Sequence, residues 1–193
     1  MIVLSEHVDY WNHDGWKDPY SSSFYTDRQG AYERRFGLES AYTPQMVVDG
    51  TEEFVGSDAA AAQKAFAREI EAVKLAVQLS SISVESNAIQ AQVEAGPLPQ
   101  KSKSDAGVYA VLALNHAESR VARGENAGRT LDHTAVVRSI TRVGGIRPGQ
   151  SFSQQINLKL EPVSGPDNLR LVVFVQESHQ GRILGAAAAP LVK

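Results

Sequence analysis

The chain of 193 residues contains no cysteine. It can therefore form no disulfide, carry no thiolate nucleophile and hold no cysteine-ligated zinc ion. It also lacks an excess of either charge, because 19 Lys and Arg residues stand against 22 Asp and Glu residues, which gives a formal net charge of -3. Nucleic-acid-binding proteins need a basic face, so this balance argues against a nucleic-acid partner.

Long apolar runs are missing too. No segment approaches the roughly 18 consecutive apolar residues of a membrane-spanning helix, and residues 108–114 form an apolar run of strand length. No charged segment or apolar stretch of a secretory signal comes before Met1–Leu4, so we expect no signal peptide in this chain. Hydrophobic residues make up 42% of the chain, which is enough to bury a core in one large domain or two small ones.

The first residues of the chain predict a strand followed by a helix. Residues 2–8 predict a strand. Asp18-Pro19 predicts the start of a helix, because Asp caps helix ends and Pro fits the first turn, and Gly37 predicts its end. Between them, the expected helix carries Phe24, Arg28, Ala31, Tyr32 and Phe36 at roughly helical spacing.

A hairpin and a second helix are predicted next. Gln45–Val48 predicts a buried strand, Asp49-Gly50 a turn, and Phe54-Val55 the returning strand. Ser57-Asp58 opens a helix, and its apolar stripe is expected to comprise Ala62, Phe66, Ile70, Val73 and Val77. The order of strand, helix, strand, strand and helix is typical of an α/β domain.

From about residue 79 the chain changes to strand patterns of period two. Residues 108–114 form a continuous apolar strand, which we expect to be covered on both faces. Six or seven short strands are expected, among them residues 82–84, 89–93, 108–114, 156–160, 169–175 and 183–184, with a polar loop at 96–105 and a turn at 179–181. The predicted fold is therefore α/β plus all-β, with an α/β domain at residues 1–78 and a small β-sandwich at residues 79–193.

The segment Tyr42–Gly50 predicts a turn that runs into a buried strand. The Thr43–Pro44 bond lies at the mouth of this strand, where a tertiary amide with its weak trans preference is often cis. A cis bond fits these residues. A plain strand entry with a trans proline fits the same residues, because Pro restricts the preceding residue to extended geometry in both cases.

Several motifs occur in an order that points to a known family: His7–Trp11, Gly15–Pro19, Tyr42–Gly50, Phe54–Ser57, Arg123–Leu131 and Ile183–Ala186. With these motifs the chain resembles the bacterial family called domain of unknown function 1223, a branch of the thioredoxin superfamily. The resemblance covers nearly the whole chain. It implies a thioredoxin-like domain followed by a β-rich domain, in proteins that are usually exported to the periplasm or secreted.

The chain departs from this family at its start. Family members carry a signal peptide, a strand and a Cys-containing loop that opens a helix upstream of the segment matching His7–Trp11, and this chain has none of them. We therefore expect a truncated thioredoxin-like domain at residues 1–78, with its first strand and helix missing. Its sheet should have a gap or an abnormal pairing beside Ile2–Val8, and the incomplete sheet could support self-association.

The resemblance implies a cis Thr43–Pro44 bond, which we predict. It also places a ligand site around Thr43, Pro44 and Gln45, where the loop would leave backbone groups free to pair with a peptide or a thiol substrate. The other candidate side chains for this site are His7, Asp9, Trp11 and Trp16. His7 and Asp9 would share one face of a strand and could form an acid/base pair or a metal site, although no third ligand is fixed by the sequence. The tryptophans could form an aromatic wall.

Structural alternatives exist for each of these residues. His7 and Asp9 could simply fix the loop at the end of the strand, and Trp11 and Trp16 could be buried against the following helix. A second polar loop offers Glu125, Asn126, Arg129 and His133 as a ligand-binding set, or as an internal hydrogen-bond network of ordinary loop residues. No nucleophile elbow, phosphate loop or dinucleotide fingerprint occurs, so we predict no catalytic residue, metal or cofactor.

Two functions follow from these observations. The first is a thioredoxin-like exported protein that performs thiol–disulfide exchange or binds thiols or peptides when full length, and is redox-inactive as this Cys-free chain. The second is a non-catalytic binding or assembly module. Whether the chain is an enzyme is left open by its residues.

We predict that the chain does not catalyse thiol–disulfide exchange, because exchange requires a thiolate to attack a disulfide sulfur and the chain has no cysteine. Dithiothreitol should reduce insulin disulfides at the same rate with and without the purified protein. Thioredoxin, which accelerates this reaction, is the positive control. An acceleration that persists after dithiol contaminants are removed would contradict this prediction.

Overall fold

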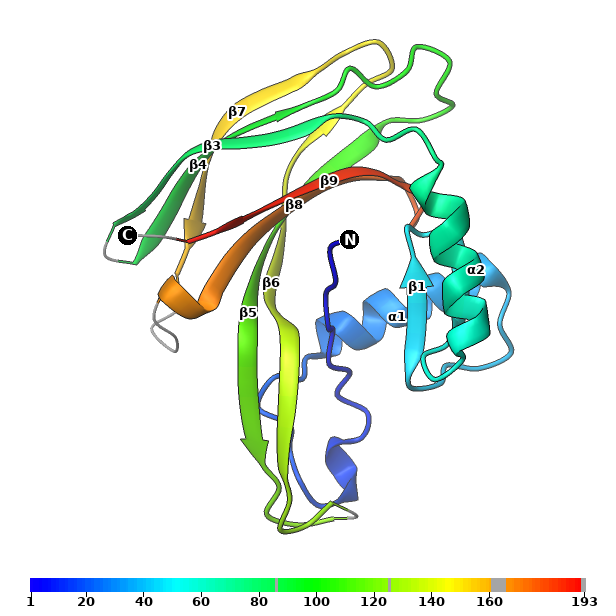
Figure 1. The fold of residues 1–193 in the computed structure, drawn as a ribbon, viewed down its shortest axis with the longest axis vertical. Coiled ribbons are helices and arrows are strands. Elements are labelled where there is room, and N and C mark those ends of the chain that lie inside the picture. The colour runs from blue at the N-terminus through cyan, green and yellow to red at the C-terminus, as the bar shows by residue number, and fades with distance from the viewer. Residues whose placement is uncertain (86, 125, 161–165, 192–193) are drawn as a thin grey trace.

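The chain folds into a mixed α/β structure that consists mostly of β-sheet (Figure 1). The computed structural model describes residues 1–85, 87–124, 126–160 and 166–191. The first part of the chain contains a 3-10 turn η1 (Asn12–Asp14), α1 (Ser23–Phe36), β1 (Gln45–Val48), β2 (Glu52–Val55) and α2 (Ala59–Ile70). The strands that follow are β3 (Val77–Glu85), β4 (Ala88–Ala95), β5 (Ala106–Arg120), β6 (Thr130–Ile146), β7 (Phe152–Lys159), β8 (Leu169–Glu177) and β9 (Ile183–Pro190), with a 3-10 turn η2 (Pro166–Asn168) before β8.

Strands β3 to β9 form two antiparallel sheets in the order β3-β4-β7 and β6-β5-β8-β9. Alternate residues of β4, β5, β7 and β8 point into one shared core, with Ile89, Val108 and Leu171 fully buried there. The intervening residues, such as Val111 and Val172, pack in a second cluster against Tyr25 of α1. The expectation that residues 108–114 are covered on both faces is thus confirmed.

The N-terminal segment does not form the predicted strand at residues 2–8. Only Ser5 pairs, in a single parallel bridge to Val136 of β6. The Ser5 amide donates to the Ala135 carbonyl at 2.8 Å, and the Val137 amide donates to the Ser5 carbonyl at 2.9 Å. β6 is the outer strand of its sheet, so its free edge provides these partners. The segment lies along the long β5–β6 pair in Figure 1.

Helix α1 begins later than the sequence predicts. The side chain of Asp18 accepts hydrogen bonds from the Tyr20 amide and from His7, and it is therefore not free to cap a helix. Ser22 caps the helix instead, because its hydroxyl accepts from the Phe24 amide. The helix ends as predicted at Gly37, which adopts a left-handed conformation with φ 68°.

The predicted hairpin is present, whereas the predicted gap beside a strand at Ile2–Val8 has no counterpart, because those residues form no strand. Within the described ranges β1 and β2 form a sheet of two strands. The predicted apolar stripe of α2 is too long, because the helix ends at Ile70, which is 83% exposed. Val73 is 97% exposed, and Val77 already belongs to β3.

A buried guanidinium joins α1 to the second part of the chain. Arg28 is only 8% exposed. Its Nε donates to Glu6 at 3.1 Å, Nη1 donates to Gln180 at 2.8 Å, and Nη2 donates to both Tyr32 and Gln176 at 3.3 Å. Burial raises the pKa of Glu6, and the Arg28 charge opposes that rise. This one side chain therefore ties together the N-terminal segment, α1 and the β8–β9 turn.

Replacing Arg28 by alanine should lower the free energy of unfolding by about 3–5 kcal/mol, because it leaves buried acceptors without their donor and Glu6 without its partner charge. Arg34 lies on the same helix and is exposed, so Arg34→Ala should change stability by less than about 0.5 kcal/mol. Urea denaturation of both variants checks this. Equal stabilities would contradict the role given to Arg28.

Candidate functional site

An exposed tryptophan stands beside the predicted proline loop. Trp11 is 54% exposed, and its indole Nε1 donates a hydrogen bond to Thr43 Oγ1 at 3.1 Å. The Tyr10 ring lies 5.4 Å from the Trp11 ring, centroid to centroid. The Thr43–Pro44 peptide is cis, as predicted, and both residues are exposed. The structure thus brings Trp11 and Thr43 together, two of the residues that the sequence proposes for one site.

A glutamine of α1 links this loop to the Tyr10 side chain. Gln29 accepts from the Tyr10 hydroxyl at 3.1 Å, and its amide donates to the Tyr42 carbonyl at 2.9 Å and to Gln45 Oε1 at 3.3 Å. Gln45 donates in turn to Glu53 at 3.3 Å, and the Tyr42 hydroxyl donates to the same carboxylate. These bonds fix the loop on the helix.

Two backbone carbonyls of the loop are already used. Pro44 accepts from the Gly56 amide at 2.8 Å, and Tyr42 accepts from Gln29. The expected recognition of a substrate by free main-chain groups is therefore wrong for these two carbonyls. Side chains around the loop are further groups that could contact a ligand.

An open groove of about 390 Å³ runs beside the loop along α1. This volume lies within the usual range for small-ligand sites. Its lining residues are Tyr10, Thr26, Asp27, Gln29, Gly30, Glu33, Arg34 and Ala41. Gly30 leaves room in the groove, because the nearest atom to a side chain placed there would be Arg34 Nη1 at 3.6 Å. The groove is lined by the Tyr10 ring, by amide and hydroxyl groups, and by charges of both signs.

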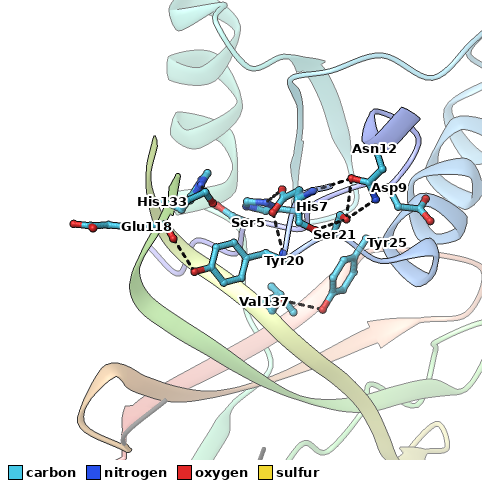
Figure 2. Close-up of polar contacts among 12 residues, drawn as sticks. Ser5, His7, Asp9, Asn12, Tyr20, Ser21, Tyr25, Glu118, His133 and Val137 are labelled. Atoms are coloured by element: carbon cyan, nitrogen blue, oxygen red, sulfur yellow. Dashed lines mark hydrogen bonds and ion pairs between the residues drawn. The ribbon is translucent and has the colours of Figure 1, made fainter. Parts of the chain in front are cut away.

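The other predicted histidines meet at a second place, on the β5–β6 pair (Figure 2). His7 Nδ1 lies 2.6 Å from Asp18 Oδ2. The His7 ring packs edge to face on His133 of β6 at 5.0 Å and on Tyr20 at 5.9 Å. The Tyr20 hydroxyl donates to the Glu118 carbonyl at 3.1 Å. His7 and His133, proposed from the sequence for two separate sites, thus form one cluster.

This histidine cluster contains a serine–histidine pair. Ser119 Oγ and His133 Nε2 are hydrogen-bonded at 2.8 Å, which is the geometry of a nucleophile and its base. Ser119 is only 3% exposed, however, so a substrate cannot reach its hydroxyl. Burial lowers the pKa of His133, and the neighbouring His7 lowers it further. Burial acts to raise the pKa of Asp18, but the hydrogen bond from His7 acts against burial, and the net result is a lowered pKa. The cluster therefore holds the N-terminal segment on β6 rather than performing acyl transfer.

Asp9 and Trp16 do not join the other predicted residues. Thr26 Oγ1 donates to the Asp9 carboxylate at 2.6 Å and accepts from the Asp9 amide at 3.0 Å. His7 and Asp9 therefore take different partners, because the segment is not a strand with one common face. Trp16 is half-buried in the loop after η1.

The second predicted loop connects β5 to β6. The Arg129 guanidinium donates to Asn126 Oδ1 at 3.4 Å, and the Gly128 amide donates to the Val121 carbonyl at 2.8 Å. These bonds favour the internal-network interpretation of the loop. Glu125 lies outside the described residues, and His133 lies on β6 rather than in the loop.

Sequence reasoning missed Tyr10 and Gln29 in the groove, and Tyr20 and Ser119 in the histidine cluster. Tyr10 lies inside the quoted motif His7–Trp11, so its position was available as a signal. The residues predicted at helical spacing on α1 did not include the polar face with Gln29 and Gly30. Nothing in the sequence near Ser119 points to His133.

Comparisons with known proteins give a family and a fold. A family model described as "Protein of unknown function (DUF1223)" matches residues 1–176. A structural-genomics protein from Agrobacterium tumefaciens is 23% identical, with a TM-score of 0.71 over 98% of this chain and 80% of its own. HBP35 of Porphyromonas gingivalis is 15% identical, with a TM-score of 0.65 over 88% of this chain and 58% of its own. No curated protein matches the chain in sequence.

In the part of the chain that the structure describes, no helix is long and apolar enough to cross a bilayer.

The Tyr42 hydroxyl should keep its proton well into the alkaline range. Burial and the Glu53 carboxylate raise the pKa of Tyr42 to about 12. Because the unfolded phenol titrates near 10, this group stabilises the fold below pH ~10 and the stabilisation is lost as pH rises toward the folded value. Phenolate absorbance during alkaline titration, taken as the difference between the parent protein and Tyr42→Phe, measures it. Glu53→Gln should bring the titration back toward 10, and an unchanged curve in that variant would contradict the assignment.

Proposed function

Because the chain belongs to the DUF1223 family, we propose that it is a thioredoxin-like binding module that holds an extended peptide in the groove between Trp11 and α1. The observation that carries the proposal is the exposed Trp11, which Thr43 holds in place beside Tyr10, a lining residue of the groove. An exposed indole that is already fixed in place loses little side-chain entropy on binding.

The lining of the groove favours a peptide over a charged metabolite. Tyr10 lines the groove, and its neighbour Trp11 adds apolar area beside it. Asp27, Glu33 and Arg34 carry both signs of charge, so no single ionic head group is selected. A chain with alternating side chains and amides suits such a mixed surface. A small thiol with a peptide backbone, such as glutathione, is the alternative ligand of the same class.

The thioredoxin-like assignment rests on the order of elements. Helix α1, the hairpin β1–β2 and helix α2 follow one another, with Pro44 at the entrance to β1. We propose that residues 1–78 correspond to a thioredoxin-like unit without its first strand and helix, and residues 79–193 to a β-sandwich. Thiol–disulfide exchange would then require a cysteine supplied by a longer form of the protein. An exported location, periplasmic or secreted, is proposed on the family resemblance alone.

A second candidate function is assembly with another chain. In the described part of the chain, β1 pairs only with β2, so its other edge keeps backbone groups that a further strand could bond. A partner strand added there would extend the two-stranded sheet. The partner could be a second copy of this chain.

Peptide binding can be measured with Trp11 as the reporter. The chain has two tryptophans, so Trp16→Phe leaves Trp11 as the single fluorophore. Peptides selected from a displayed random dodecapeptide library should change its emission on titration. Thr43→Val removes the acceptor of the indole N–H and should weaken the binding several-fold, with a loss of stability below about 0.5 kcal/mol because the site is exposed. Glutathione titrated in the same way tests the thiol alternative.

Two further variants separate binding from stability. Gly30→Leu fills the groove but replaces a helix glycine, so it should abolish binding while stability rises by about 0.5–1 kcal/mol. Phe24→Ala removes an aromatic side chain that is 49% exposed but does not line the groove, and it should leave the affinity unchanged. Equal affinities in the parent and Gly30→Leu would refute the groove. Concentration-dependent dimers in light scattering, with no peptide selected, would favour assembly instead.

A further inference from the structure

The β5–β6 pair extends beyond its sheet as a two-stranded arm. β8 pairs with β5 only as far as Leu114, whereas β5 continues to Arg120 and stays paired with β6. The N-terminal segment covers one face of this arm through Tyr20 and the histidine cluster. Because side chains alternate along a strand, His116 and Glu118 lie on the opposite face. Both are more than half exposed there.

Three side chains with metal-binding atoms converge on this open face. His116 and Glu118 are two residues apart on β5, and Asp132 is directly opposite Glu118 on β6. One nitrogen or oxygen atom from each lies within 4.8 Å of the other two. His116 Nε2 and Glu118 Oε1 are 3.8 Å apart. Ligands about 2.0–2.1 Å from one tetrahedral metal ion lie roughly 3.3–3.4 Å apart, so small side-chain rotations bring all three to one ion.

We propose that His116, Glu118 and Asp132 bind a first-row divalent metal ion of the Zn²⁺ type. An imidazole nitrogen with two carboxylates suits such borderline cations better than Mg²⁺ or Ca²⁺, which prefer oxygen ligands alone. Three protein ligands on an exposed face leave the remaining positions to water or to a ligand from solution.

The charges on the arm give independent support. Glu118 and Asp132 are a directly opposed pair of like charges, which destabilises an antiparallel strand pair by several tenths of a kcal/mol. An exposed face does not need acidic residues at both positions for packing. A bound cation converts this repulsion into attraction.

The backbone beneath these ligands is held in place. The His116 amide donates to Asn168 Oδ1 at 3.1 Å, and the His116 carbonyl accepts from Asn168 Nδ2 at 2.8 Å. The Glu118 carbonyl accepts from Tyr20 on the covered face. Ligands on a fixed backbone lose less entropy when the metal binds.

Isothermal titration calorimetry of the full chain with ZnCl₂, after treatment with a chelator, tests the site. We expect one ion per chain and a rise in the thermal midpoint on binding. His116→Ala and Asp132→Asn should each weaken binding by more than about tenfold. His179→Ala is the matched control, because His179 is an exposed histidine in the β8–β9 turn and its loss should leave the affinity unchanged.

Two further measurements make the outcome decisive. Co²⁺ should give a visible absorption spectrum in the parent and in His179→Ala but not in His116→Ala. Glu118→Gln should stabilise the protein in the presence of chelator, because it removes the like-charge pair, and should weaken Zn²⁺ binding. Zn²⁺ affinity that survives His116→Ala, that falls equally in His179→Ala, or that is matched by Ca²⁺ would overturn the proposal.

Discussion

The buried guanidinium of Arg28 is the interaction on which the arrangement of this protein depends. A charge with five donors cannot be left unpaired in the interior, so its position forces four acceptors to stay close to one another. Those acceptors belong to the N-terminal segment, to α1 itself and to the β8–β9 hairpin. The planar group also lies over the Tyr32 and Phe174 rings, at 5.3 and 5.7 Å from their centroids. A lysine could meet neither requirement, because it offers a point charge rather than a planar fork.

The groove follows from that constraint. Arg28 holds one face of α1 against the sheet. The face with Thr26 and Gly30 therefore points toward Tyr10 and the proline loop. Glu69 of α2 accepts hydrogen bonds from Lys74 and Arg182. These bonds fix α2 and the β1–β2 turn to the β8–β9 hairpin, which Arg28 also contacts. Burial opposes the charge on Glu69, but these hydrogen bonds lower its pKa, so the carboxylate stays ionised at neutral pH. Polar contacts, more than apolar area, thus position the candidate site.

Sequence patterns predicted the parts of this structure that depend on neighbouring residues. The end of α1 at Gly37, the β1–β2 hairpin and the strand at 108–114 each have a local signal. The strand expected at residues 2–8 failed, because a strand exists only where another strand offers its edge, and β6 offers it to Ser5 alone. For the same reason the contact of His7 with His133 could not be foreseen. The pairing of Glu118 with Asp132 also needs the strand register, which no local pattern supplies.

The long separation of these contacts along the chain has a consequence for synthesis on the ribosome. Ser5 bonds to Ala135, Arg28 to Gln176, and Glu69 to Arg182. The N-terminal helices therefore leave the ribosome well before the strands that cover them, and they must wait with apolar and charged groups exposed. Chaperone binding during translation would protect that interval. Docking of the β8–β9 hairpin is in effect the last step of folding. A nascent chain that stops before this hairpin would lack the contacts that hold the N-terminal helices in place.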